Sequence, residues 1–250
     1  MQSWDEWKAT RKAALLAEDG WLNLTDRVEI GAGPQTVGRA PGNDLVLSVG
    51  PDHLGVLTLA DGQAQFATPD RRVQVFAPAP GGFAQLRVPP LLLEIHPVDG
   101  VAALRVRDLT APRGVDLHYF PPNPAWVIRA RWSALGTPET TTIGQRGGAD
   151  MQVNLTHLAR FSLDGQEIEL APTHWKAGQP MFVFRDATSG RETYGAARFL
   201  MGEEMTETEI TLDFNRAFTP PCAFTPFAIC PLPPRQNILP FAVRAGEIWP

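Results

Sequence analysis

Residues 36–47 read TVGRAPGNDLVL, and residues 142–153 read TIGQRGGADMQV. Both stretches hold a threonine, an aliphatic residue and a glycine, and then an aspartate that precedes alternating apolar residues. Glycine permits the positive φ angles of tight turns, and aspartate can hydrogen-bond its own backbone two residues on. Each stretch predicts a strand, a turn and a second strand, and their likeness predicts one β module that occurs twice.

The match between the two stretches continues along the chain. His53-Leu54 has a counterpart in His157-Leu158, and the run LTLADGQ at 57–63 has one in FSLDGQ at 161–166. An Asp-Gly pair between two alternating apolar runs is a strong signal for a β-hairpin. We therefore interpret the sequence as an internal duplication in which each module holds at least two hairpins.

The composition is typical of a β fold with many turns. The 250 residues include 24 prolines and 22 glycines. Proline breaks helix interiors and glycine weakens them. Turn residues recur between short apolar alternations at 31–34, 41–44, 61–62 and 80–82. The sequence therefore predicts an all-β fold with one helix, at the N-terminus.

Capping chemistry marks the start of this helix. Ser3 and Glu6 have the spacing of a capping box, in which each side chain satisfies a backbone donor at the helix start. Trp4 and Trp7 begin an apolar stripe of helical period, and Gly20 is a suitable stop. The stripe predicts that the helix packs against the rest of the chain.

A linker candidate, PPNP at 121–124, divides the remaining chain. We expect two related β-sandwich or barrel-like modules, the first at 21–124 and the second at 125–212, after a helical segment at 1–20. The final segment, 213–250, is rich in proline and phenylalanine. So many prolines exclude a helix, and the aromatic residues predict an extended, polyproline-like run packed on the body.

Charge and hydropathy exclude several partners. The chain has 22 basic and 27 acidic residues, a net charge of -5, whereas nucleic acid binding needs a basic surface. No apolar run approaches the roughly 18 residues that span a bilayer, and acidic residues stand where a signal peptide has basic ones. We expect a cytoplasmic protein that binds neither nucleic acid nor membrane.

Cysteine chemistry provides a first candidate site. Cys222 and Cys230 are too few for a disulfide scaffold, but they could form a thiol or metal site. Metal sites usually bring cysteines at closer spacing, with two further ligands. The spacing therefore favours two small buried thiols and no metal site. No motif in the sequence identifies a cofactor.

Polar residues inside apolar or proline-rich runs are the main candidates for a ligand site. They are Asp186, Tyr194, Arg198, Asp213, Asn215, Arg235 and Asn237. Asp186 and Asp213 stand out, because two neighbouring carboxylates can perform acid–base chemistry. An aspartate in such a run is also typical of a turn cap or an arginine partner, so both interpretations stay open.

Several of these residues lie in runs with a recognisable pattern. The runs are FRDATSG at 184–190, LDFN at 212–215, PPCAFT at 220–225 and CPLPP at 230–234, with Asn237 after them. Together with the tryptophan-rich N-terminus, they resemble a bacterial and archaeal family of unknown function, DUF1684. The resemblance covers nearly the whole chain and implies no reaction and no ligand.

A second resemblance lies in the first module. The run GRAPGND at 38–44 and His53 are similar to the opening of forkhead-associated domains, β-sandwiches that bind phosphothreonine. The resemblance implies phosphate binding through Arg39. The serine that this family places shortly before the histidine is replaced by glycine and proline at 50–51, and the second copy has Gln145 in place of the arginine. These departures count against phosphate binding.

The sequence names no reaction and leaves open whether the chain is an enzyme. It contains no nucleophile elbow, phosphate-binding loop or zinc-protease motif. The leading hypothesis is a non-catalytic module that binds a small ligand or a protein, with its site near the module interface and the C-terminal segment. One alternative is a metal-independent, hydrolase-like enzyme that uses Asp213 and Asp186. The other alternative is phosphopeptide binding through Arg39.

Overall fold

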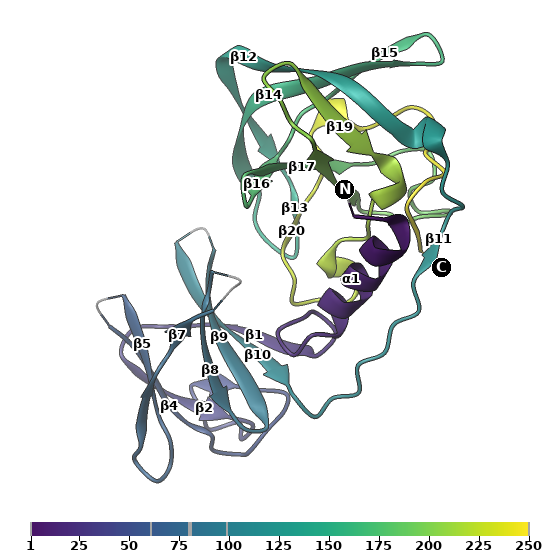
Figure 1. Cartoon of the computed structure of the whole chain (residues 1–250). Helices are drawn as coiled ribbons and strands as arrows, with labels where there is room; N and C mark the ends of the chain where they lie inside the picture. Colours follow the sequence, from purple (N-terminus) through teal and green to yellow (C-terminus); the bar gives the residue numbers. More distant parts are fainter. Residues whose placement is uncertain (1, 61, 80–81, 99, 250) are drawn as a thin grey trace. The chain divides into compact units, whose positions relative to one another are not determined.

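The chain is mostly β, with one α-helix near its N-terminus (Figure 1), as the sequence predicts. The computed structural model describes residues 2–60, 62–79, 82–98 and 100–249. The chain forms two compact units. We call Met1–Arg11 with Asp116–Pro250 the split unit, and Lys12–Val115 the continuous unit. Among the described residues, no helix has the length and apolar character needed to cross a bilayer.

The continuous unit contains two five-stranded sheets. One has the order β1 (Leu24–Glu29), β10 (Val101–Asp108), β9 (Leu91–Val98), β8 (Ala84–Val88) and β7 (Ala77–Pro78). The other has the order β3 (Leu45–Val46), β2 (Pro34–Gly38), β4 (Gly55–Ala60), β5 (Gln63–Ala67) and β6 (Val73–Val75). Among the described residues of this unit, every strand pair is antiparallel except β2 with β3, which is parallel.

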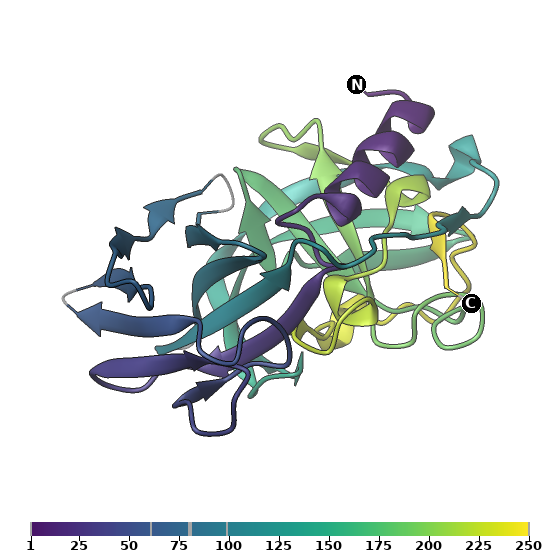
Figure 2. The ribbon, with the colours of Figure 1, turned by 90° about the horizontal axis from the view of Figure 1, so that it is seen from below.

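One apolar core joins these two sheets, which face each other in Figures 1 and 2. Leu57 and Phe66 contribute from one sheet, and Leu93, Leu104 and Val106 contribute from the other. All five side chains are fully buried. Leu104 and Val106 lie two positions apart on β10, because side chains two positions apart on a strand point to the same face. The two sheets of the continuous unit therefore share one buried core.

The split unit is built on a seven-stranded antiparallel sheet. Its order is β15 (Gln166–Leu170), β14 (Met151–Leu163), β12 (Val127–Ile143), β19 (Glu209–Asp213), β18 (Arg198–Glu203), β17 (Gln179–Phe184) and β16 (His174–Lys176). Two further pairs join β11 (His118–Tyr119) to β21 (Glu247–Ile248), and β13 (Gln145–Arg146) to β20 (Cys230–Pro231). The pairing of β12 with β14 shifts between Ala134 and Glu139. Pro138 lies in that interval, and proline cannot donate to a strand ladder.

The C-terminal segment packs on this sheet and shares its core. Phe214, Leu239 and Val243 are buried among side chains of β12, β17 and β18, and Figure 2 shows the segment in yellow among the green strands of the same unit. Three short 3-10 helices lie in it: η2 (Phe214–Arg216), η3 (Pro221–Ala223) and η4 (Arg235–Asn237). A fourth, η1 (Pro124–Trp126), precedes β12.

The N-terminal helix α1 (Trp4–Leu16) begins with the predicted capping box. The Ser3 backbone N–H donates to the Glu6 carboxylate at 2.8 Å, and the Glu6 N–H donates to the Ser3 hydroxyl at 3.3 Å. Trp4 and Trp7 stack with ring centroids 5.2 Å apart, and both meet the Tyr119 ring edge-on. The predicted packing of the aromatic stripe is therefore present within the split unit.

One predicted repeat element occurs in both units. The hairpin β4–β5 pairs Ala60 with Gln63, and the hairpin β14–β15 pairs Leu163 with Gln166, so each turn contains two residues. Asp61 of the first turn lies outside the described residues, as does part of the predicted turn at 80–82. The likeness at this hairpin is local.

Strand pairing beyond the hairpin differs between the two stretches that suggested a duplication. Thr36 pairs with Val56, whereas Thr142 pairs with Gln152, which lies much closer along the chain. Strand β3 is parallel to β2 on one edge of its sheet, whereas the matching residues form the start of β14, antiparallel to β12. The structure does not show the internal duplication.

Candidate functional site

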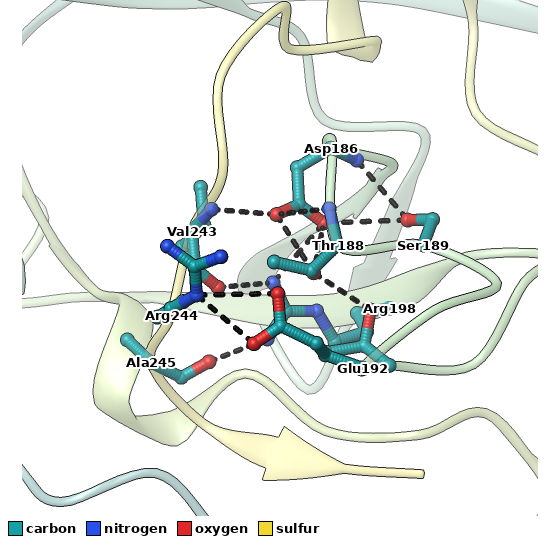
Figure 3. Close-up of polar contacts among 9 residues, drawn as sticks. Asp186, Thr188, Ser189, Glu192, Arg198, Val243, Arg244 and Ala245 are labelled. Atoms are coloured by element: carbon teal, nitrogen blue, oxygen red, sulfur yellow. Dashed lines mark hydrogen bonds and ion pairs between the residues drawn. The ribbon is translucent and has the colours of Figure 1, made fainter. Parts of the chain in front are cut away.

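Asp186, which follows β17, lies in a buried network in Figure 3. Its side chain has no exposed area. The carboxylate accepts hydrogen bonds from the Thr188 hydroxyl at 2.9 Å and from the Val243 backbone N–H at 2.6 Å. It also accepts one from the Arg198 guanidinium at 3.3 Å. A carboxylate with this many partners inside the protein is held in one orientation.

Arg198, at the start of β18, is the partner of this carboxylate and is also fully buried. Its guanidinium donates to the backbone carbonyls of Val243, at 2.8 Å, and Ala245. Its carbon lies 5.0 Å from the centre of the Phe184 ring. Burial lowers the pKa of Arg198, and the neighbouring Asp186 opposes that shift. The pair fastens residues 243–245 to the sheet (Figure 3).

Asp213 and Asn215 form a separate group at the end of β19. The Asp213 carboxylate accepts from the Asn215 backbone N–H at 3.1 Å and pairs with the Arg216 guanidinium at 3.1 Å. The Asn215 amide exchanges two hydrogen bonds with the Asn123 backbone, at 2.9 and 3.0 Å. These contacts cap η2 and hold the chain that leads into β12.

Asn237 and Arg235, both in η4, have opposite surroundings. Asn237 is fully buried, and its amide bonds the backbone of Ala171 at 2.8 and 2.9 Å and the Val183 carbonyl at 2.8 Å. Arg235 is exposed. Asn237 therefore fastens the C-terminal segment to the sheet, whereas Arg235 takes no part in that contact.

The seven polar residues proposed from the sequence do not form one cluster. Within the described part of the chain, no hydrogen bond or ion pair joins Asp186 to Asp213. Each carboxylate instead has an arginine partner and a turn to cap. Tyr194 lies next to a pocket through its contact with Cys222.

That pocket, which we call the Cys222 pocket, has a volume of about 550 Å³. It is lined by Arg146, Gly147, Cys222, Ala223, Phe224, Thr225, Pro226 and Ala228. Pairing of β13 with β20 sets Arg146 opposite Cys230 and brings the two sides of the pocket together. All lining residues belong to the split unit.

The two cysteines lie together at this pocket as thiols. The Cys222 backbone N–H donates to the Cys230 Sγ at 3.4 Å. The Tyr194 hydroxyl donates to the Cys222 carbonyl at 3.2 Å and lies 3.8 Å from its Sγ. A hydrogen bond from the Cys230 thiol, with smaller effects of Tyr194 and Arg146, lowers the pKa of Cys222 to about 7 against the opposing effect of burial.

Tyr194 and Arg146 complete the surroundings of this thiol. Burial, reinforced by Cys222, raises the pKa of Tyr194 to about 12, so its hydroxyl keeps its proton and remains a donor at neutral pH. The Arg146 guanidinium lies 6.0 Å from the centre of the Tyr194 ring, a cation–π distance. Arg146 is exposed. The arrangement stabilises negative charge on Cys222.

Sequence reasoning named the two thiols and Tyr194 but missed Arg146. Arg146 lies in the run TIGQRGG, whose likeness to TVGRAPG makes Gln145 the residue that differs from Arg39. Arg146 lies far from both cysteines along the chain, so no local signal connects it with them. Its approach to Cys222 depends on the β13–β20 pairing, which links residues far apart along the chain.

Arg39, the residue proposed for phosphate binding, lies after β2 in the continuous unit. Its guanidinium pairs with the Asp52 carboxylate at 2.9 Å, and both side chains are more than half exposed. The Asn43 amide donates to the Asp52 carbonyl, and the His53 ring contacts the Asn43 amide oxygen at 3.2 Å. A Cβ at Gly38 would lie 2.3 Å from the Asp52 carbonyl oxygen, which explains the glycine. These residues tie two loops together.

Comparison with known proteins adds a family relationship. A model described as "Protein of unknown function (DUF1684)" matches residues 115–248. An uncharacterised protein from gene locus rrnAC0354 of Haloarcula marismortui, solved by NMR in solution, is 32% identical. The match covers 53% of this chain and 76% of that chain, with a TM-score of 0.44. No curated protein matches the chain. The matched residues include the whole lining of the Cys222 pocket.

Proposed function

The chain belongs to the DUF1684 family of proteins of unknown function, and from the chemistry of the Cys222 pocket we propose that it binds a small organic anion there. This proposal specifies the binding function inferred from the sequence. It places the site beside the C-terminal segment and within the split unit, because the pocket lining comes from that unit alone.

The observation that carries this proposal is the charge of the pocket lining. Arg146 is the charged side chain in it, and the lining contains no carboxylate. Because Arg146 is exposed, its guanidinium can pair with an incoming carboxylate, sulfonate or phosphate in the planar geometry that arginine favours. Opposite charge beside the opening therefore selects an anion.

Size and apolar lining support an organic ligand. Phe224, Pro226 and Ala228 supply apolar surface, and Thr225 adds a hydroxyl. A volume of about 550 Å³ lies within the roughly 300–1,000 Å³ of small-molecule sites. An inorganic ion would leave most of this surface uncovered. The ligand therefore combines an anionic group near Arg146 with an apolar part near Phe224.

The carboxylates of the hydrolase alternative have partners that favour a structural role. Asp186 is paired with Arg198, and Asp213 is paired with Arg216. A general base needs a lone pair directed at a substrate, whereas these oxygens accept hydrogen bonds from the fold. The pairing of Arg39 with Asp52 likewise gives no support to phosphopeptide binding.

The test measures ligand-induced stabilisation of the full chain. We expect a panel of small carboxylates, sulfonates and phosphates to contain compounds that raise the melting temperature, because a ligand that binds only the native state stabilises it. Arg146→Gln is expected to weaken their binding roughly 10-fold or more, since charged hydrogen bonds contribute about 1.5–3 kcal/mol.

Arg131→Gln is the matched control, because Arg131 is an exposed arginine of the same unit outside the pocket lining. Its binding is expected to equal that of the wild type. The proposal is wrong if no anion stabilises the wild type, or if both arginine variants bind the same anion with unchanged affinity.

A further inference from the structure

We propose that Cys222 and Cys230 form a dithiol centre that undergoes thiol–disulfide exchange with small anionic disulfides bound in the Cys222 pocket. This inference rests on the proposed function, because it takes the anion near Arg146 to belong to the substrate. It adds a chemical step and a substrate class.

Proximity of the two sulfurs is the first support. The Cys222 backbone N–H donates to the Cys230 Sγ at 3.4 Å, and the Cys230 thiol is the main cause of the lowered pKa of Cys222. They are eight residues apart, between Pro221 and Pro231. Proline restricts its backbone, and β20 pairs Cys230 with Arg146, so the loop holds the sulfurs near each other.

The two thiols differ in access, which assigns their roles. Both cysteines are largely buried, but Cys222 lines the pocket and is 8% exposed, whereas Cys230 is not part of the lining and is 3% exposed. A bound disulfide therefore meets Cys222 first. Cys222 is the attacking thiol, and Cys230 is the resolving thiol that lies behind it.

The surroundings of Cys222 favour attack at neutral pH. The Cys230 thiol is the main cause that lowers the pKa of Cys222 to about 7, so a larger share of Cys222 is thiolate at neutral pH than in an ordinary cysteine. A thiol whose pKa is close to the ambient pH is the most effective in exchange, because a lower pKa would also reduce its nucleophilicity. The Tyr194 hydroxyl, 3.8 Å from the sulfur, provides a further donor.

The reaction has two balanced steps. The Cys222 thiolate attacks one sulfur of the small disulfide, whose S–S bond breaks, and the first small thiolate leaves and takes a proton from water. Cys230 then loses its proton to water and attacks the Cys222 sulfur, and the second small thiolate leaves and is protonated. The protein dithiol loses two electrons and becomes a disulfide, and the small disulfide gains them and becomes two thiols.

The first experiment treats the full chain with oxidised glutathione, an anionic disulfide, and follows intact mass. The wild type is expected to lose two hydrogens, with Cys222 and Cys230 joined in the mapped peptide. Cys230→Ser is expected to stop at a mixed disulfide on Cys222, and Cys222→Ser is expected to gain no adduct within the same time. A wild type that keeps both thiols overturns the inference.

Charge selection is tested by comparing oxidised glutathione with cystamine, a cationic disulfide. The wild type is expected to react faster with the anionic compound, and Arg146→Gln is expected to reduce the ratio of the two rates about 10-fold. A change in the reactivity of the Cys222 thiol affects both rates alike, so it does not alter their ratio. Arg131→Gln is the control and should keep the wild-type ratio. An equal rate for both compounds in the wild type overturns anion recognition.

A measurement on the wild type alone tests the inference even if the cysteine variants fail to fold. Alkylation by iodoacetamide is expected to modify Cys222 before Cys230 and to be half-maximal near pH 7. Equal labelling of the two cysteines, or a midpoint near the ordinary thiol pKa of about 8.5, overturns the assigned roles.

S-methylglutathione, which cannot exchange, separates the two proposals. Stabilisation of the protein by this compound, with both thiols left intact by oxidised glutathione, overturns the exchange and leaves the binding site. Oxidation by both disulfides without stabilisation by any anion overturns the binding function and, with it, the anionic substrate class.

Discussion

Asp186 combines a buried charge, a turn cap and a long-range contact in one side chain. Its carboxylate is bonded to Thr188 within its own turn, to Arg198 on β18 and to the Val243 backbone in the C-terminal segment. A buried charge of this kind is costly unless it is both paired and hydrogen-bonded. Because Asp186 joins its own turn, β18 and the C-terminal segment, its role is to hold these three parts of the chain together.

Asp186→Asn is expected to lower the free energy of unfolding by about 3–5 kcal/mol, because it leaves the Arg198 guanidinium buried without its counter-charge. Urea unfolding of the full chain measures the change. Asp116→Asn is the control, since the Asp116 side chain is 87% exposed and should leave stability unchanged. A stable Asp186→Asn protein that has lost anion binding would instead place Asp186 in the ligand site.

His96 provides a pH-dependent prediction in the continuous unit. It is 7% exposed, its ring lies 4.6 Å from the Phe83 ring, and burial, together with the Arg105 charge, lowers its pKa to about 4. Between the ordinary value of 6.5 and about 4, the unfolded chain binds a proton that the folded chain does not. The stability present above pH 6.5 is therefore lost as the pH falls toward 4.

We expect His96 to lower the free energy of unfolding by an amount on the order of 2 kcal/mol as the pH falls from 6.5 toward 4, after allowance for solvent screening. Unfolding at pH 7 and pH 4.5, with wild type and His96→Gln, measures it. The variant should show a smaller difference between the two pH values. His118→Gln serves as the control, because the His118 side chain is 59% exposed. Equal pH dependence of all three proteins would contradict the assignment.

At the residue scale, the sequence indicated which polar residues are unusual but not what they contact. Asp186, Asp213 and Asn237 are all buried, which a polar group inside an apolar run can indicate. Their partners could not be predicted, because Asp186 contacts Val243 and Asn237 contacts Ala171, far along the chain. Whether these residues meet at one site depends on strand positions that only the folded sheet provides.

In helix α1, local contacts determine where the helix begins, and contacts with distant residues attach it to the split unit. Its start follows from the Ser3–Glu6 capping box, which sequence spacing reveals. Its attachment depends on Arg11, which donates to the Glu247 carboxylate at 2.7 Å and to the Thr219 carbonyl at 2.7 Å. Glu247 is 1% exposed and also accepts from the Thr219 backbone N–H at 2.7 Å.

Glu247→Gln is expected to loosen the first turns of α1, because Arg11 then lacks a buried counter-charge. Limited proteolysis should cut within residues 3–11 several-fold faster than in the wild type, and tryptophan emission should shift to longer wavelength as Trp4 and Trp7 become hydrated. Asp5→Asn is the control, because the exposed Asp5–Lys8 pair joins neighbours on the helix surface. Wild-type cleavage in Glu247→Gln would contradict this attachment.

The local sequence could predict the hairpins. It also suggested an internal repeat, which the strand pairing does not show. A two-residue connection at residues 164–165 follows from Asp-Gly chemistry alone. Thr36 and Thr142 stand in similar local sequences but pair with partners at different separations. Register is set by which apolar face is buried and by the turns, so similar turn residues do not ensure similar sheets.

The whole molecule combines one unit that is continuous along the chain with one that is not. The sequence predicted the mostly β class, because proline, glycine and alternating apolar residues act locally. It could not predict that Met1–Arg11 belongs with Asp116–Pro250, since no local pattern reports a contact between the two ends. The family match at 115–248 begins at the same division.

Because the split unit needs both ends of the chain, the continuous unit can fold first during synthesis on the ribosome. Residues 12–115 can emerge and complete both of their sheets while the partners of the first eleven residues are still unsynthesised. Arg11 and Glu247 are separated by 236 positions. At a synthesis rate of roughly 5–20 residues per second, Glu247 is added on the order of tens of seconds after Arg11. During that interval the first turns of α1 lack the carboxylate that holds Arg11 in the finished fold.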